Sequence, residues 1–303
     1  MSAIEYQTTL ESLVRCAGIG VHTGARAKLE IHPAPVGTGI VFQRTDRSSG
    51  QAIPARGDAV TEVQLGTTLT NPAGDSVATV EHLLAACAGL ALDNLVIEID
   101  GPEVPIMDGS SAVFCELFLK AGLKRQAAPR RRIRILEGVK VGDGVKWARL
   151  SPSADNVLSL KAQIEFESRA IGTQTMALRL IPGLFARDIA FARTFGFSRD
   201  VEMLQKMGLA RGGSLDNAVV IDGDAIMNPE GLRSHDEFIR HKLLDAIGDL
   251  MLAGGPIAGA YEAVQPGHAL NNQLVRALLE TPEAWCWETD EVSSLPLEVG
   301  AAL

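Results

Sequence analysis

Residues 237–250 read EFIRHKLLDAIGDL, and this stretch predicts an amphipathic helix on which the reading of the whole chain depends. Ser234, followed three positions later by Glu237, predicts a capping box at the start of the helix. The glycines and proline at 254–256 predict its end. The side of the helix that we expect to be buried carries apolar residues at helical spacing, namely Ile239, Leu243, Ala246, Ile247 and Leu250.

The polar stripe of this helix groups four titratable residues. His241 and Asp245 project one above the other because they are one turn apart, and Lys242 and Asp249 lie beside them. A solvated face with salt bridges is the usual reading of such a stripe. An imidazole and a carboxylate at positions i and i+4 also form a clamp for a metal ion. The metal reading requires a third ligand from another part of the chain.

Composition limits the classes of function. The chain has 303 residues, of which 46% are hydrophobic and 21% charged, as expected for a folded protein. Its net charge of −9 argues against a nucleic-acid partner, although a local basic patch can still hold a phosphorylated small molecule. The four cysteines form no CxxC pair, so any metal must be held by histidine and carboxylate.

We also expect a cytoplasmic protein. The first ten residues, MSAIEYQTTL, lack a basic region followed by an apolar run. No stretch approaches the roughly 20 apolar residues that span a bilayer, so no transmembrane segment is expected.

Strands and helices alternate irregularly, which predicts an α+β fold rather than a doubly wound sheet. The stretch APRRRIRI at 128–135 interrupts the pattern, and we place a domain boundary there, with domains at 1–127 and 133–303. No phosphate-binding glycine loop of the GxxxxGK[ST] or GxGxxG kind is present. We expect strands at 27–31, 39–42, 94–99, 139–141, 146–150, 158–166, 175–178 and 219–221, and further helices at 80–88, 111–121 and 271–279.

Glu81 and His82 open the helix predicted at 80–88, for which Thr79 is the expected N-cap. Taken alone, the pair is read most simply as a glutamate favourably placed at a helix start beside a packed histidine. Together with His241 and Asp245, His82 would complete a His2Asp zinc site of the catalytic kind, with one position open for water. Glu81 would then be placed to take a proton from that water.

The other histidines are less decisive. His268, in QPGHALNN, is expected on a loop before a helix, either bonded locally or serving as a general acid. His235 is expected at the surface and His32 in a structural role. His22, between glycines in GIGVHTG, fits a strand-end motif and a binding role about equally well. The turn-rich stretch at 101–111 is read as structural.

Several stretches together resemble a known family. GIGVHTG, TVEHLLAA, DGPEVPIMDGSSA, ARTFGF and DEFIRHKLLDAIGDL followed by GHALNN are similar to the UDP-3-O-acyl-N-acetylglucosamine deacetylases, zinc enzymes of bacterial lipid A synthesis. The resemblance runs from about residue 15 to about residue 285, in the order of the family.

The resemblance implies roles for particular residues. It matches His82, His241 and Asp245 to the zinc ligands, Glu81 to the general base and His268 to the general acid. It further implies an oxyanion-stabilising hydroxyl at Thr194, polar supports at Lys242 and Asp249, and Phe195 at the mouth of an acyl passage within 181–210. We read Asp249 as a partner of His268 or of Lys242. Zinc is the expected metal, with ferrous iron as the alternative, because a His2Asp site does not select strongly between them.

The resemblance also implies an arrangement. Each domain would contain a β-sheet with paired helices, and the helices would be sandwiched between the two sheets, so that ligands from both halves meet at the centre. The chain departs from the family at Ser168-Arg169 and at Gln265, near the expected uridine diphosphate region. Lys146 and Arg169 could supply positive charge there.

The function implied is hydrolysis of the N-acetyl group of UDP-3-O-[(3R)-3-hydroxyacyl]-N-acetylglucosamine, giving UDP-3-O-acyl-glucosamine and acetate, the committed step of lipid A biosynthesis. A monomer is expected. Two alternatives stay open at this point: a zinc amidohydrolase acting on a different acylated amine, and a metal-free module that binds a sugar nucleotide or lipid.

Overall fold

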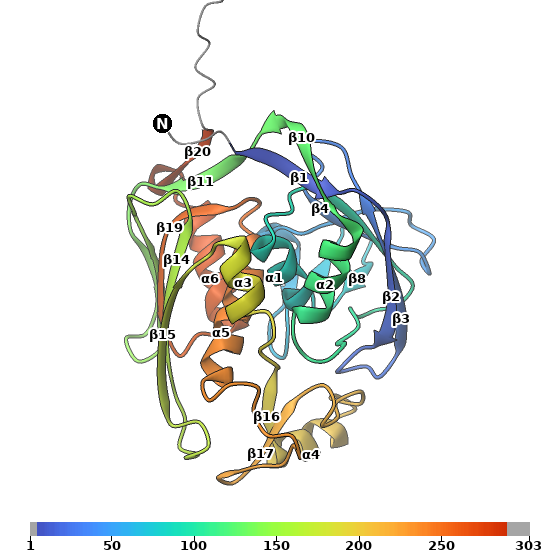
Figure 1. Ribbon diagram of the computed structural model, residues 1–303, viewed down its shortest axis with the longest axis vertical. Helices are drawn as coiled ribbons and strands as arrows, with labels where there is room; N and C mark the ends of the chain where they lie inside the picture. The colour runs from blue at the N-terminus through green and yellow to red at the C-terminus, as the bar shows by residue number, and fades with distance from the viewer. Residues whose placement is uncertain (1–4, 290–303) are drawn as a thin grey trace, which may run out of the picture.

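The computed structural model describes residues 5–289, and its main feature is a layer of helices held between two large β-sheets (Figure 1). The ends of the two predicted domains, residues 1–4 and 290–303, lie outside the described range. The sandwiched α+β arrangement expected from the sequence is confirmed. Within the described range, no helix has the length and apolar composition needed to cross a bilayer.

The first sheet contains five strands in the order β2-β3-β9-β4-β5. Burial alternates along β3, where Ala27, Leu29 and Ile31 face the helices, because successive side chains of a strand point to opposite faces. Neighbouring strands are antiparallel except for β4 and β9, which are parallel. The strands are β2 (Val14–Ile19), β3 (Arg26–Pro33), β4 (Ile40–Arg44), β5 (Ile53–Pro54) and β9 (Leu95–Ile99). A small sheet beside it contains β6 (Val60–Glu62), β7 (Thr68–Thr70) and β8 (Ser76–Val77).

The second sheet is built around β19 (Ile257–Val264), which runs antiparallel to one neighbour and parallel to two others. Its seven strands also include β11 (Arg131–Ile135), β12 (Val139–Gly142), β13 (Trp147–Ser151), β14 (Leu158–Glu165), β15 (Thr173–Arg179) and β20 (Trp285–Thr289). All eight strands expected from the sequence are present, with ends that differ by a few residues.

The stretch at 128–135 does not interrupt the strand pattern, contrary to our expectation. It contains the end of β10 (Leu123–Pro129) and all of β11. At this point the chain changes partners, because β10 pairs with β1 (Tyr6–Leu10) whereas β11 pairs with β19 and β20. That change supports the proposed division into domains near residues 128–132.

The helices between the sheets come from both halves of the chain. They are α1 (Glu81–Gly89), α2 (Ala112–Ala121), α3 (Pro182–Asp188), α5 (Glu237–Met251) and α6 (His268–Leu279), with short 3-10 turns at η1 (Gly57–Ala59) and η2 (Pro282–Ala284). Their apolar sides share one continuous core with the inner faces of both sheets.

Both predicted helix caps are wrong. Thr79 has a left-handed φ of 56° and donates its hydroxyl to Glu103, so α1 begins without a side-chain cap. The hydroxyl of Ser234 bonds to Asp236, while the carboxylate of Glu237 accepts bonds from Arg193 and Arg233. A tertiary ion pair therefore replaces the expected local capping box.

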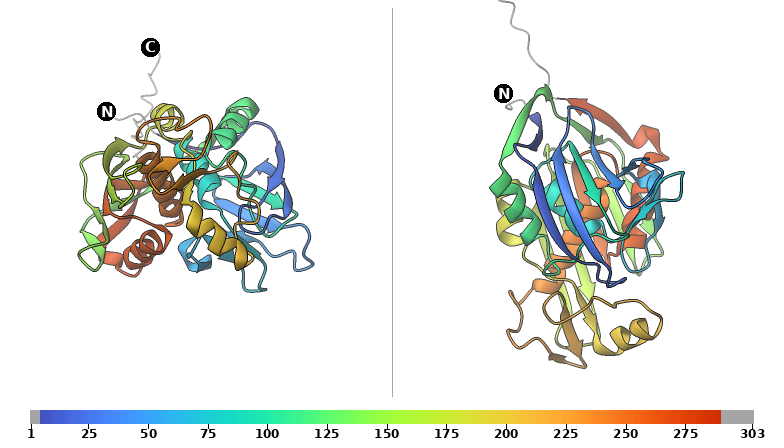
Figure 2. Two further views of the ribbon diagram at one scale, coloured as in Figure 1. Left: turned by 90° about the horizontal axis from the view of Figure 1, so that it is seen from below. Right: turned by 90° about the vertical axis from the view of Figure 1, so that its right-hand side faces the viewer.

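The expected acyl-passage segment at 181–210 is split between two places. Its first part, α3, packs on α1, where the ring of Phe185 occupies the space that a side chain at Gly89 would need. The rest enters a lobe that projects beyond the sandwich (Figures 1 and 2). This lobe contains β16 (Phe195–Phe197), α4 (Ser198–Lys206), β17 (Val219–Asp222) and β18 (Ala225–Ile226).

The two halves of the chain approach each other closely where α1 and α5 cross. A Cβ atom at Gly248 in α5 would lie 2.1 Å from the carbonyl oxygen of Glu81 in α1. Only glycine permits this approach, although glycine inside a helix costs about 1 kcal/mol relative to alanine. A glycine that is unfavourable within the helix is therefore needed where the two helices touch.

We therefore expect Gly248→Ala to destabilise the protein by about 1–3 kcal/mol, because the added methyl group meets backbone and forces the helices apart. Helix propensity alone would make the substitution stabilising. Urea unfolding followed by circular dichroism measures the difference. Gly183→Ala in α3 is the matched control, because a Cβ there meets no atom within 4 Å. A Gly248→Ala protein as stable as the parent would contradict the close crossing.

Candidate metal centre

The α1–α5 crossing brings three potential metal ligands together. His82 lies at the start of α1, and His241 and Asp245 lie one turn apart in α5. Asp245 Oδ1 is 3.5 Å from His82 Nε2 and 3.2 Å from His241 Nε2. One ligand atom from each residue lies within 4.8 Å of the other two. All three side chains are buried, so the reading of this stripe as a solvated face is wrong.

The surroundings of His241 fix which of its ring nitrogens is free. Nδ1 lies 3.0 Å from the carbonyl oxygen of Ala192, and because a carbonyl only accepts, Nδ1 carries the proton. Burial lowers the pKa of His241, which favours the neutral ring. Nε2 therefore presents a lone pair toward His82 and Asp245, as metal coordination requires.

One carboxylate oxygen of Asp245 accepts a hydrogen bond, and the other accepts none from residues 5–289. Oδ2 accepts a 2.8 Å bond from Lys242 Nζ. Burial opposes ionisation of Asp245, yet His241 and Lys242 outweigh it and keep its pKa well below the usual range. Oδ1 is buried and has no hydrogen-bond partner among the described residues. An anionic oxygen in this state faces two imidazoles, which is the donor set that zinc or ferrous iron binds.

Glu81 lies beside the cluster with its carboxylate oriented by the backbone. It is 3% exposed, and Oε2 accepts a 2.9 Å bond from the amide of Thr67. Oε1 lies 3.8 Å from His268 Nε2. Burial raises the pKa of Glu81 above its ordinary value, which suits a group that receives a proton.

His268 forms a second polar group with Asp249. We expected it on the loop before this helix, but it is the first residue of α6. Its Nδ1 lies 3.0 Å from Asp249 Oδ2. Burial disfavours the imidazolium form, but the carboxylates of Asp249 and Glu81 outweigh it and raise the pKa of His268 to about 10. At neutral pH the ring is therefore charged and able to donate a proton.

Three further residues from the sequence prediction lie near the cluster. The ring of Phe195 is 6.2 Å from the His241 ring, and Lys242 Nζ lies 5.5 Å from the Phe195 ring centre. Thr194 precedes Phe195 and is anchored through its amide to the carbonyl oxygen of Gly109. The short strand β16 thus begins beside the face of α5 that carries His241 and Lys242.

Lys146 and Arg169 lie in exposed turns of the second sheet. The side chain of Arg169 is 91% exposed and lies 4.0 Å from Asp224. Among residues 5–289, neither basic side chain forms a hydrogen bond or ion pair with the cluster.

The remaining histidines are placed outside the cluster. His235 is at the surface, as expected. His22 Nε2 lies 3.1 Å from the carbonyl oxygen of Leu65, which favours the structural reading. His32 lies between Glu30 and Glu98 on the outer face of the first sheet, where the three form a second, partly exposed group of potential ligands.

Sequence reasoning missed the residues that hold the site in place. Thr67 bonds both Glu81 and Asp249, and Asn271 donates a 2.9 Å bond to Asp249. Nothing in the sequence around Thr67 indicates this contact. The fully buried Arg193 lies between Ala192 and Thr194 and binds Glu237 at the start of α5. An arginine in an otherwise apolar stretch is the only signal that could have revealed it.

Comparisons with known proteins show which sequences this chain is similar to. Residues 7–280 match the family described as UDP-3-O-acyl N-acetylglycosamine deacetylase. The chain is 52% identical over 281 residues to the UDP-3-O-acyl-N-acetylglucosamine deacetylase of Phenylobacterium zucineum, which covers 92% of this chain and 95% of that protein. It is 48% identical over 280 residues to the proteins of the same name from Shewanella frigidimarina and Shewanella oneidensis, with 92% of each chain covered.

Arg193→Met should destabilise the fold by about 3–5 kcal/mol, because it leaves the fully buried carboxylate of Glu237 without its charged partner. Arg187→Met removes an exposed pair with Asp188 and should change stability by no more than about 0.5 kcal/mol. Denaturant unfolding of the two variants provides the comparison. Equal stabilities would mean that the buried pair does not anchor the start of α5.

Proposed function

Because the chain belongs to the family of UDP-3-O-acyl N-acetylglycosamine deacetylases, we propose that His82, His241 and Asp245 form the metal centre of its active site. The observation that carries this proposal is the buried Asp245 oxygen that faces two imidazoles without a hydrogen-bond partner among the described residues.

The enzyme removes the N-acetyl group from UDP-3-O-acyl-N-acetylglucosamine, a step of lipid A biosynthesis. Water cleaves the amide bond, and acetate and the free 2-amino sugar result. The reaction needs a base for the attacking water, positive charge for the oxyanion that forms at the carbonyl, and a proton for the departing nitrogen.

Zinc is the metal that we propose, with ferrous iron as the alternative, because two imidazoles and a carboxylate suit both ions. When bound, such an ion polarises the acetyl carbonyl and lowers the pKa of water at its open position. Lys242 holds Asp245 Oδ2, so that Oδ1 alone is left for coordination.

Glu81 is the proposed general base. Its carboxylate is adjacent in sequence to the ligand His82, and the Thr67 amide fixes one oxygen so that the other faces the site. Its raised pKa makes it a better proton acceptor than an exposed glutamate.

His268 is the proposed general acid, and Asp249 is the residue that positions it. The Asp249 carboxylate binds Nδ1 and keeps the ring charged, so the proton on Nε2 is available to the leaving amine. Asp249 is itself held by Thr67 and Asn271, which restricts its rotation.

The remaining roles are proposed from position and from the family. The hydroxyl of Thr194 would donate to the oxyanion. Phe195 would meet the acyl chain where it enters the lobe, and Lys242 would add positive charge close to the reacting groups. Lys146 and Arg169 are proposed contacts for the uridine diphosphate, which their exposure permits.

Neither alternative considered from the sequence is retained. Relatives that share about half of their residues with this chain over most of its length are named deacetylases, which argues against a different acylated amine as substrate. A metal-free binding module would have no need for an unpaired carboxylate oxygen between two imidazoles in the core. A cytoplasmic location and a monomeric state stay proposals, to be tested by cell fractionation and analytical ultracentrifugation.

Purified protein should contain about one equivalent of zinc or iron, and His241→Ala should lose it together with activity. His32→Ala is the matched control, since it alters only the second, partly exposed ligand group. Elemental analysis after exhaustive dialysis distinguishes the two sites. Loss of metal from His32→Ala and not from His241→Ala would place the ion elsewhere.

Glu81→Gln should retain the metal while kcat falls by about 10²-fold or more, because the amide cannot accept a proton from water. Elemental analysis and turnover of the same preparation separate the base from the ligands. Near-normal turnover of this variant would show that Glu81 is not the base.

The pH dependence of kcat/KM should change when Asp249 is replaced. His268 is active when protonated, so kcat/KM falls as pH rises through its pKa, at about pH 10 in the parent enzyme. Asp249→Asn removes the charge that raises this pKa, and the basic limb should move to lower pH by about 1–3 units. Thr67→Val keeps the carboxylate and should leave the limb near its original position. An unshifted limb in Asp249→Asn would exclude His268 as the acid that the limb reports.

A further inference from the structure

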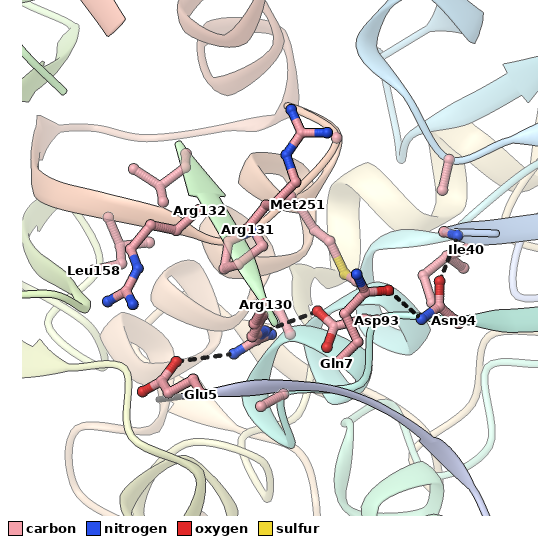
Figure 3. Close-up of a pocket in the computed structure, with 18 of the residues that line it drawn as sticks. Glu5, Gln7, Ile40, Asp93, Asn94, Arg130, Arg131, Arg132, Leu158 and Met251 are labelled. Carbon is pink, nitrogen blue, oxygen red and sulfur yellow. Dashed lines mark hydrogen bonds and ion pairs between the residues drawn. The ribbon is translucent and has the colours of Figure 1, made fainter. Parts of the chain in front are cut away.

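A cavity separate from the metal centre lies at the other ends of the same two helices, and Figure 3 shows residues that line it. It has a volume of about 680 Å³ and is lined by Ala88 at the end of α1 and by Leu250 and Met251 at the end of α5. The ten-residue separation of His241 and Met251 along α5 corresponds to about 15 Å. The cavity is therefore distinct from the metal centre but shares its supporting helices.

The lining of this cavity is basic in an acidic protein. Five arginines line it against two carboxylates, and two of the five have partners outside the lining, because Arg56 pairs with Asp58 and Arg132 with Glu288. The arginines are Arg56, Arg125, Arg130, Arg131 and Arg132. Like charges concentrated in a concave site repel one another and attract an anion, because the protein walls focus the field.

The two carboxylates of the lining are both engaged by a single arginine. Arg130 Nε lies 2.8 Å from Asp93, and its Nη1 lies 4.0 Å from Glu5, as the dashed lines of Figure 3 show. Asp93 thus pairs with Arg130 and also accepts a bond from the amide of Thr8.

Two of those arginines rest on aromatic rings instead. The guanidinium of Arg125 lies 3.6 Å from the ring centre of Tyr6, and that of Arg131 lies 4.4 Å from the ring centre of Trp287. Within residues 5–289, neither guanidinium forms a hydrogen bond or an ion pair. Stacking fixes the plane of a guanidinium and leaves its N–H edge available, which is the arrangement that binds phosphate or carboxylate.

The rest of the lining is largely apolar. Ile40 comes from the first sheet, Leu158 from the second, and Leu180 from the segment that leads into α3. Ile247 and Met251 supply the α5 side. An anion without a hydrocarbon part would leave this apolar surface in contact with water. The lining therefore favours a ligand with both an anionic group and a hydrocarbon part.

We propose that this cavity binds an anionic amphiphile, a molecule with a phosphate or carboxylate head and a short hydrocarbon chain. The head binds the N–H edges of Arg125 and Arg131, and the chain packs against Leu158, Leu180 and Met251. The site is separate from the substrate site, so ligand and substrate bind at the same time. Because the ligand joins the ends of α1 and α5, its binding stabilises the fold that holds the metal.

Isothermal titration with octyl phosphate tests the proposal on the full-length holoenzyme. Octyl phosphate should bind at least ten times more tightly than octanol, which lacks the charge, and than inorganic phosphate, which lacks the chain. Octanoate compares the two head groups, and tighter binding of either one supports the site. The double variant Arg125→Gln, Arg131→Gln should weaken octyl phosphate binding by tenfold or more.

Arg149→Gln is the matched control, because Arg149 is an exposed arginine of β13 that pairs with Glu262 outside the cavity. It should bind octyl phosphate as the parent does. Circular dichroism confirms that each variant is folded, and Met251→Glu provides a second test through the apolar floor. Equal affinity in the parent and the arginine double variant would overturn the proposal. So would competitive inhibition of deacetylation by octyl phosphate that persists unchanged in the double variant, because the ligand would then occupy the substrate site.

Discussion

The structure depends on the contact between the backbones of α1 and α5. Gly248 lets α5 approach the carbonyl oxygen of Glu81 so closely that no other residue fits. Neither helix carries all three proposed ligands, because His82 belongs to one and His241 and Asp245 to the other. The two sheets enclose this pair of helices from both sides (Figure 1). The sandwich therefore serves to hold a polar crossing inside an apolar core.

Placing charged groups in a core is costly unless each has a partner. Most groups here are satisfied: Asp249 accepts bonds from Thr67, His268 and Asn271, and Glu81 accepts one from Thr67. Asp245 keeps one oxygen without a hydrogen bond, facing the two imidazoles. A cation bound at this point would interact with the unpaired Asp245 oxygen and remove the cost of burying it. The arrangement that destabilises the fold without a cation therefore suits hydrolysis with one.

Local patterns predicted the elements well, and they selected His82, His241 and Asp245, which the structure brings together. Short β-like runs between turn signals indicated the strands, the helical spacing of apolar residues indicated α5, and the i and i+4 positions of His241 and Asp245 suggested the clamp. What failed was local reasoning about groups that have tertiary partners. Thr79 bonds Glu103 and Glu237 bonds Arg193, so neither forms the cap that its sequence suggests. The roles of Gly248 and Thr67, and the basic cavity, depend on contacts between segments far apart in the chain.

The most direct test of the account is to locate the metal by anomalous diffraction from crystals of the holoenzyme, collected on both sides of the zinc absorption edge. The account predicts one strong peak about 2.0–2.2 Å from His82 Nε2, His241 Nε2 and Asp245 Oδ1. A fully occupied peak elsewhere, for example between Glu30, His32 and Glu98, with none at the α1–α5 crossing, would contradict it.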